Sequence, residues 1–189
     1  QFYVGAVDSL GAQTMAPAAG PASRALYQVA DGQSSALPAH ELRLIMLDAD
    51  RDFMLDPTNR MSNGRNGATL IYDQTEVFYD AGARLQGTAA SRIRDGDPYV
   101  SYDIDFPPGR LFRGVQNNIG VDRSGRGPTI RAQDEIYVLH MFHRAGIPVP
   151  YSDLCYFISP RTIHTGTAIL QLAGYGSTFV SEQYDQTGS

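Results

Sequence analysis

The stretch ATLIYDQTEVFYDAGARLQ, residues 68–86, carries the clearest structural pattern of the chain. Two runs rich in aliphatic and aromatic residues, 68–72 and 76–86, flank the short polar segment Asp73-Gln74-Thr75. Such runs, separated by a few polar residues, are typical of a β-hairpin. The sequence therefore predicts two antiparallel strands here, and the rest of the sheet is expected to build on them.

A period-2 pattern continues on both sides of this hairpin. Over residues 99–106, Val100, Tyr102, Ile104 and Phe106 alternate with more polar residues, as expected of a half-buried strand. Upstream, we predict a strand at the start of 41–47 and then a short helix over 48–56. Further short strands are predicted at 114–122, 154–158 and 167–172.

One longer helix is predicted over residues 129–145. Ile136, Leu139, Phe142 and Ala145 form an apolar stripe at helical spacing. Gly146 provides a C-terminal stop. Together with the strands, this pattern predicts an α+β fold, with a mainly antiparallel sheet and one long helix.

The first residues have the pattern of a different unit. A strand-like alternation opens the chain, an Ala-, Gly- and Pro-rich loop covers residues 11–21, and a second apolar run covers 25–29. We interpret residues 1–29 as the C-terminal hairpin of a preceding β-sandwich domain of fibronectin type III or immunoglobulin kind. Residues 30–40 are then a linker and 41–189 the main domain. A strand pattern at the first residue also indicates an excerpt from a longer protein.

Composition restricts the functions open to the chain. Its net charge is -5, and all 15 basic residues are arginine. A mildly acidic chain without a basic cluster is not expected to bind nucleic acid, and no apolar run is long enough to predict a membrane span. A phosphate-binding or Schiff-base lysine is excluded.

The single cysteine, Cys155, allows no internal disulfide and is expected to be a small buried residue.

An acidic run has part of a calcium-binding pattern. Asp48, Asp50 and Asp52 have the first three oxygen spacings of an EF-hand loop. The sixth position is Phe53 where a glycine is needed, and the twelfth is Asn59 rather than glutamate. We therefore expect a capped polar helix face rather than a calcium site.

Three histidines are candidate metal ligands. His140 and His143 lie three residues apart on the predicted helix and share a face, and His164 follows later. No carboxylate at a suitable spacing completes a zinc site. We therefore predict no metal site, and we predict no catalytic residues.

Three residues are candidates for binding a nucleotide or another anion. Arg84, near the end of a predicted strand, can offer a two-pronged donor to a phosphate or carboxylate. Its alternative role is a bridge to Asp103 or Asp105 on the next strand. Arg131 and Glu135 stand at i and i+4 on the predicted helix, where they can pair with each other.

Six segments in order resemble the CotH-like (spore-coat H kinase-like) domain. They are ELRLIM (41–46), GATLIY (67–72), FYDAGARLQG (78–87), SYDIDF (101–106), LFRG (111–114) and RAGIPVP (144–150). The resemblance covers residues 41 to about 180, so residues 41–189 would be the N-terminal part of such a domain. It implies half of an atypical kinase fold that uses ATP with Mg or Mn to phosphorylate serine, in a secreted or cell-surface bacterial protein.

The chain departs from this family at the positions that matter for catalysis. The family usually has lysines just before the serine of the SYDIDF-like strand, where this chain has Tyr99 and Val100. The family's catalytic aspartates lie beyond Ser189. We therefore expect a non-catalytic, pseudokinase-like structural or binding module without a cofactor in this stretch. Its expected partners are the remainder of its parent chain and extracellular or surface proteins. The alternative is part of an active secreted kinase.

Overall fold

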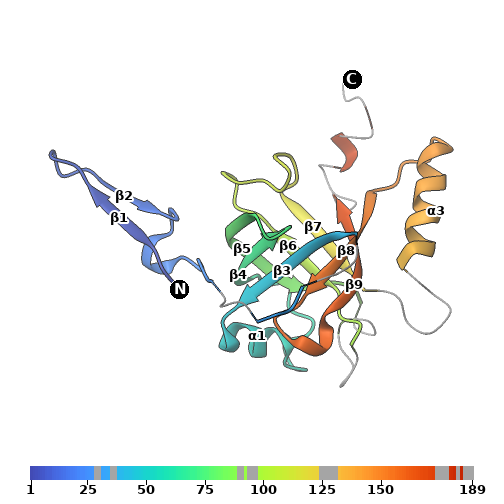
Figure 1. Cartoon of the computed structure of the whole chain (residues 1–189), viewed down its shortest axis with the longest axis horizontal. Coiled ribbons are helices and arrows are strands. Elements are labelled where there is room, and N and C mark those ends of the chain that lie inside the picture. The colour runs from blue at the N-terminus through green and yellow to red at the C-terminus, as the bar shows by residue number, and fades with distance from the viewer. Residues whose placement is uncertain are drawn as a thin grey trace.

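A computed structural model describes residues 1–27, 31–34, 38–88, 92, 98–123, 132–172, 179–181 and 184. These residues fold mainly into strands (Figure 1). A two-stranded sheet of β1 (Val4–Val7) and β2 (Gln13–Ala16) lies apart from a closed barrel. The barrel strands are β3 (His40–Met46), β4 (Asn66–Tyr72), β5 (Glu76–Leu85), β6 (Tyr102–Asp105), β7 (Asn118–Asp122), β8 (Tyr151–Ile158) and β9 (Gly166–Leu172).

Helices are short and lie outside the barrel wall. They are α1 (Asp48–Leu55), α3 (Ala132–Arg144) and the 3-10 turns η1 (Gly20–Ala22) and η2 (Thr162–His164). Among the described residues, no helix is both long and apolar enough to span a membrane.

The barrel closes in the order β3-β4-β5-β6-β7-β9-β8. All neighbouring strands are antiparallel except β3 and β8, which pair in parallel with Leu42 opposite Phe157. This one parallel pair joins the first barrel strand to a strand more than a hundred residues later. Closure gives every barrel strand a hydrogen-bonded neighbour on both sides, so none of the seven is an edge strand along its whole length.

The predicted hairpin forms β4 and β5. Its three-residue turn has Asp73 at φ 48° and Gln74 at φ 59°, left-handed values of the kind found in tight hairpin turns. The Thr75 amide donates to the Tyr72 carbonyl at 3.1 Å. The Asp73 carboxylate accepts the Glu41 amide at 2.8 Å, which ties the turn to β3.

The hydrophobic core fills the barrel. Aromatic rings pack edge to face or stack at its centre, with Phe78 4.9 Å from Phe106 and Phe106 5.5 Å from Phe112 between ring centroids. Buried apolar side chains from every barrel strand belong to the same core cluster. The largest fully buried side chains are Tyr102, Phe78, Phe112, Phe157, Leu42, Leu44, Leu70, Leu85, Ile104, Ile119, Ile169 and Leu170.

A bulge in β5 anchors the N-terminal segment to the barrel. Asp80, at φ 57°, lies where the β4–β5 register shifts. Its carboxylate accepts the Ser23 hydroxyl at 2.8 Å and the Arg24 amide at 2.6 Å. Thr69 accepts the Leu26 amide at 3.0 Å, and Ala25 is fully buried. The β1–β2 hairpin beyond this anchor projects away from the barrel (Figure 1).

The α+β prediction is wrong. The sheet closes into a mixed barrel, and α3, with 13 residues, flanks it instead of forming a helical layer. The kinase-like fold is therefore also wrong. The alternation of apolar and polar residues predicted the strands but could not distinguish an open sheet from a closed one, because both bury alternate side chains.

The β-sandwich expectation for residues 1–29 is also wrong. The partner of β1 is β2, which lies inside the expected loop 11–21. Residues 25–27 form no strand, and 28–29 lie outside the described residues. The apolar run at Ala25 and Leu26 reflects burial against the barrel rather than strand pairing. The division into units 1–29, 30–40 and 41–189 stays a prediction.

Candidate binding groove between α3 and β8

Helix α3 is held beside the barrel by its contacts with β8. Its end is fixed by Gly146 at φ 74°, with the Gly146 amide donating to the His143 carbonyl at 3.1 Å and the Ile147 amide to the Phe142 carbonyl at 2.9 Å. These two bonds make the Schellman motif that ends many helices. The chain then turns into β8, and the His143 ring lies 4.6 Å from that of Tyr151.

A groove of about 570 Å³ runs between the helix and the strand. From α3 it is lined by Gln133, Ile136, Tyr137, Leu139, His140 and His143. From the first half of β8 and the residue before it, the groove is lined by Pro150, Tyr151, Ser152, Asp153 and Leu154. The lining is mainly apolar and aromatic, which is typical of sites that receive an apolar group.

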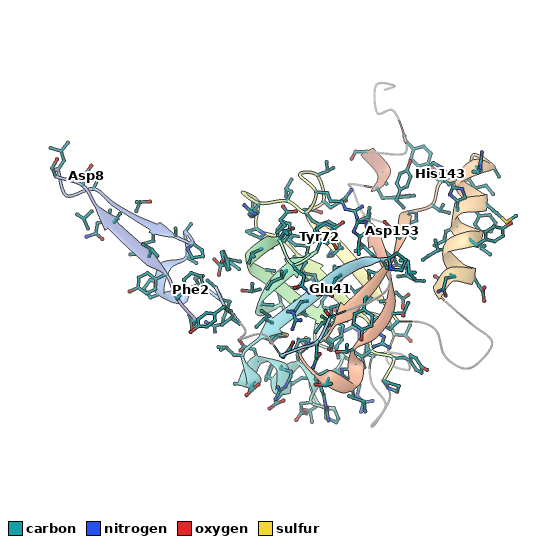
Figure 2. The ribbon with its side chains drawn as sticks, viewed as in Figure 1. Phe2, Asp8, Glu41, Tyr72, His143 and Asp153 are labelled. Carbon is teal, nitrogen blue, oxygen red and sulfur yellow. The ribbon has the colours of Figure 1, made fainter. Side chains whose placement is uncertain are left out.

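The groove is continued by a second, more polar pocket of about 430 Å³. This pocket is lined by Pro38, Ala39, His40, Asp73, Asp153 and Leu154. Asp153 and Leu154 line both cavities and so mark their junction. Figure 2 shows Asp153 on the side of the barrel that faces α3.

Three polar side chains, those of Tyr72, Asp73 and Arg113, surround His40 and Asp153 at this junction. His40 Nδ1 lies 2.8 Å from Asp73 Oδ2 and 2.8 Å from the Tyr72 hydroxyl. His40 Nε2 lies 3.5 Å from Asp153 Oδ2. Arg113 donates to the Tyr72 hydroxyl at 2.7 Å and lies 3.8 Å from Asp153 Oδ2. In this cluster, the acidic side chains of Asp73 and Asp153 contact basic or neutral side chains rather than each other.

Different parts of the fold supply these side chains. His40 opens β3, Tyr72 ends β4, Asp73 sits in the hairpin turn and Asp153 lies on β8. Arg113 has a φ of 51°, a left-handed conformation that is uncommon for a residue other than glycine. This conformation places its guanidinium over the Tyr72 ring, 5.4 Å from the centroid.

The protonation states of two members follow from their surroundings. Partial burial raises the pKa of Asp73, but the Glu41 amide and His40 outweigh it, so the pKa is lowered overall. Burial raises the pKa of Tyr72 more than Arg113 lowers it. At neutral pH the cluster therefore holds an Asp73 carboxylate and a Tyr72 phenol, and it can accept hydrogen bonds from a cationic group.

The structure places Arg84 in an ion-pair network on β5 and β6. Its guanidinium donates to the Asp103 carboxylate on β6 and lies 3.3 Å from Asn63 Oδ1. Asp103 also lies 3.2 Å from Arg65, which contacts Asp105 at 2.6 Å. Arg84 therefore forms the bridge to Asp103, which was one of its two predicted roles. Its other predicted role, anion binding, stays a prediction.

Of the other two anion candidates, the structure describes Glu135, and it does not bring Glu135 to Arg84. Glu135 lies on α3, half-buried, whereas Arg84 lies on β5, on a different side of the barrel (Figure 1). Arg131 lies outside the described residues. Glu135 does not line the groove, although its neighbour Ile136 does.

The three histidines that are candidate metal ligands lie at two different places in the fold. His140 and His143 both line the groove. His164 is buried elsewhere, with its Nδ1 3.1 Å from the Tyr102 hydroxyl. No group of three or more histidine, cysteine or acidic side chains is arranged to hold a metal ion in the part of the chain that the structure describes.

The residues at the junction were missed by sequence reasoning. His40, Tyr72, Asp73 and Asp153 come together only because β8 returns to pair with β3, which places His40 opposite Cys155. No local pattern signals that contact. In comparisons with known proteins, no protein-family model and no curated protein matches the chain. The resemblance to CotH-like domains thus stays a prediction that rests on the sequence motifs.

Proposed function

We propose that the chain is a non-catalytic binding module of a secreted or surface protein and that its partner binds in the α3–β8 groove. The observation that carries this proposal is the mainly apolar lining of the groove, next to a helix with exposed apolar side chains. Tyr137, Val138, Met141 and Phe142 are all exposed on α3. Several exposed apolar side chains on one helix beside a groove are typical of interaction sites in soluble proteins.

A protein segment is the partner that suits this surface. The groove lies along a helix and extends into a polar pocket, so an extended segment can place an apolar side chain in one and a polar group in the other. Such a segment can come from the remainder of the parent chain or from an extracellular protein. The non-catalytic part of the proposal is supported by the missing lysine, because phosphoryl transfer generally relies on a lysine at the phosphates.

Selection from a displayed random-peptide library against the purified chain tests the proposal. Tyr137 lines the groove but is 65% exposed, so Tyr137→Ala removes a binding contact without disturbing the barrel core. Tyr3→Ala is the matched control, because Tyr3 is an exposed tyrosine on the N-terminal hairpin segment. We expect apolar peptides whose affinity falls about 10-fold in Tyr137→Ala, as for an aromatic hot spot, and is unchanged in Tyr3→Ala. Failure to select any peptide, or equal binding to both variants, would contradict the proposal.

A further inference from the structure

The groove between α3 and β8 has a charge preference built into its junction with the polar pocket. The described side chains that line the two cavities include the carboxylates of Asp153 and Asp73 and the imidazoles of three histidines, and they include no guanidinium. One guanidinium lies nearby, that of Arg113 at 3.8 Å from Asp153 Oδ2, so the two carboxylates outnumber the arginine beside them. A segment that carries a positive charge is therefore electrostatically favoured over one that carries a negative charge.

The two carboxylates differ in how fully they are already bonded. Asp73 accepts the Glu41 amide and contacts His40 Nδ1, both at 2.8 Å. Asp153 Oδ1 accepts the Leu154 amide at 2.9 Å. Asp153 Oδ2, in contrast, lies 3.5 Å from His40 and 3.8 Å from Arg113, longer than the usual range of a hydrogen bond. Asp153 thus retains an acceptor atom for an incoming donor.

The position of Asp153 makes this acceptor relevant to the groove. Its side chain is 46% exposed, and it is shared by the apolar and the polar cavity. An apolar side chain seated against Ile136 and Leu139 would leave the next residues of the same segment close to Asp153. A planar guanidinium or an ammonium group there would gain a charge-assisted hydrogen bond.

We propose that the α3–β8 groove recognises a protein segment in which an apolar anchor is followed or preceded by a basic residue, and that Asp153 binds this basic residue. This inference rests on the proposed function, because it specifies the chemistry of the partner for the same groove. Arg113 lies 3.8 Å from Asp153 Oδ2, beyond hydrogen-bond distance, and donates to the Tyr72 hydroxyl at 2.7 Å, so it leaves room for a partner's donor at Asp153.

Matched synthetic peptides test this inference. Each carries a leucine- or phenylalanine-centred segment, with arginine, citrulline or glutamate at the same flanking position. Affinities are measured by fluorescence polarisation. We expect the arginine form to bind about 10-fold tighter than the citrulline form, which has the same shape without the charge, and the glutamate form to bind most weakly.

Variants assign the preference to one carboxylate. Asp153→Asn should abolish the difference between the arginine and citrulline peptides, whereas Asp153→Glu, which keeps the charge, should retain a preference. Asp52→Asn removes one exposed acidic group on α1 and should leave the preference unchanged. Circular dichroism confirms that each variant is folded.

The outcomes separate the two claims. If the peptides bind through the groove but arginine and citrulline forms bind equally, the inference is wrong while the proposed function stands. If none of the peptides binds and the library selection also fails, the proposed function itself falls. If the chain dimerises in analytical ultracentrifugation and Tyr137→Ala makes it monomeric, the occupant is a second copy, and the inference is overturned.

Discussion

The guanidinium of Arg84 donates to the carboxylate of Asp103 across the β5–β6 pair, where the two residues are direct partners. Asp103 is buried, and it is also contacted by Arg65 and by the Asn118 amide. The strongest anion candidate of the sequence is thus already occupied by a carboxylate of its own fold. Two predictions follow from this pairing, one on stability and one on nucleotide binding.

Arg84→Ala should destabilise the barrel. The substitution removes one donor from a buried carboxylate, while Arg65 and Asn118 remain, so we expect a loss of about 1–2 kcal/mol in the free energy of unfolding. Arg51→Ala is the control, because Arg51 pairs with the exposed Asp48 and Asp52 and should cost roughly 0.5 kcal/mol or less. Urea unfolding followed by circular dichroism measures both. An equal effect of the two substitutions would contradict a buried role for the Arg84–Asp103 pair.

Millimolar ATP with Mg²⁺ or Mn²⁺ should leave the melting temperature of the chain unchanged. The donors of Arg84 are already directed at Asp103 and Asn63. A ligand at about 100 times its Kd stabilises a folded protein by about 2.7 kcal/mol, so binding would be visible in a thermal-shift experiment. A rise in melting temperature that disappears in Arg84→Ala would show that the network opens to bind phosphate. It would also revive the kinase alternative.

The predictable part of the fold is the part encoded locally. The β4–β5 hairpin follows from two apolar runs around Asp73-Gln74-Thr75, which lie between the paired residues Tyr72 and Glu76. The end of α3 follows from Gly146, which adopts φ 74°. Each of these features depends on residues within a few positions of each other. Their signals are therefore present in a single sequence.

The barrel and the groove depend on a contact that is distant in sequence. Leu42 on β3 pairs with Phe157 on β8, and that pairing closes the sheet. The same closure brings His40 to Asp153. Alternation of apolar and polar residues gives each strand a buried face, but it does not determine which strand pairs with it. The junction residues therefore had no signal, and Arg84 stood out only because of its place in a well-defined strand.

Cys155 should be inert to thiol reagents in the native state. Burial raises the pKa of its thiol to about 12, and the side chain is fully inaccessible inside the barrel wall. At pH 8 only a fraction on the order of 10⁻⁴ would be thiolate, and the thiolate is the reactive form. Ellman's reagent should therefore give no signal at pH 8 until guanidinium chloride unfolds the chain, when one thiol per chain should react. Rapid reaction of the native chain would contradict the closed barrel at β8.

Tyr102 should make the fold sensitive to alkali. Its hydroxyl is fully buried on β6, 3.0 Å from Ser159 Oγ and 3.1 Å from His164 Nδ1. Burial raises the pKa of this phenol to about 12, compared with about 10 in an unfolded chain. The folded state therefore disfavours the phenolate. The stability that depends on the neutral form is fully present below pH 10 and is lost as the pH rises from 10 to 12.

The size of this alkaline destabilisation follows from the shift in the pKa of Tyr102, and Tyr102→Phe is its control. A difference of about two pKa units corresponds to about 3 kcal/mol, so the free energy of unfolding should fall by up to that amount between pH 10 and pH 12. Tyr102→Phe cannot ionise. It loses the buried hydrogen bonds to Ser159 and His164, which should cost about 1–2 kcal/mol at pH 8, but its stability should depend less on pH.

The comparison of the wild type with Tyr102→Phe isolates Tyr102 from the other ten tyrosines, because those are present in both proteins. Urea unfolding at a series of pH values should give curves in which the wild type is more stable at pH 8 and loses its advantage as the pH approaches 12. A stability difference between wild type and Tyr102→Phe that stays constant from pH 8 to pH 12 would mean that the phenol ionises as easily in the barrel as in water. That result would contradict the buried position of Tyr102 in the barrel core.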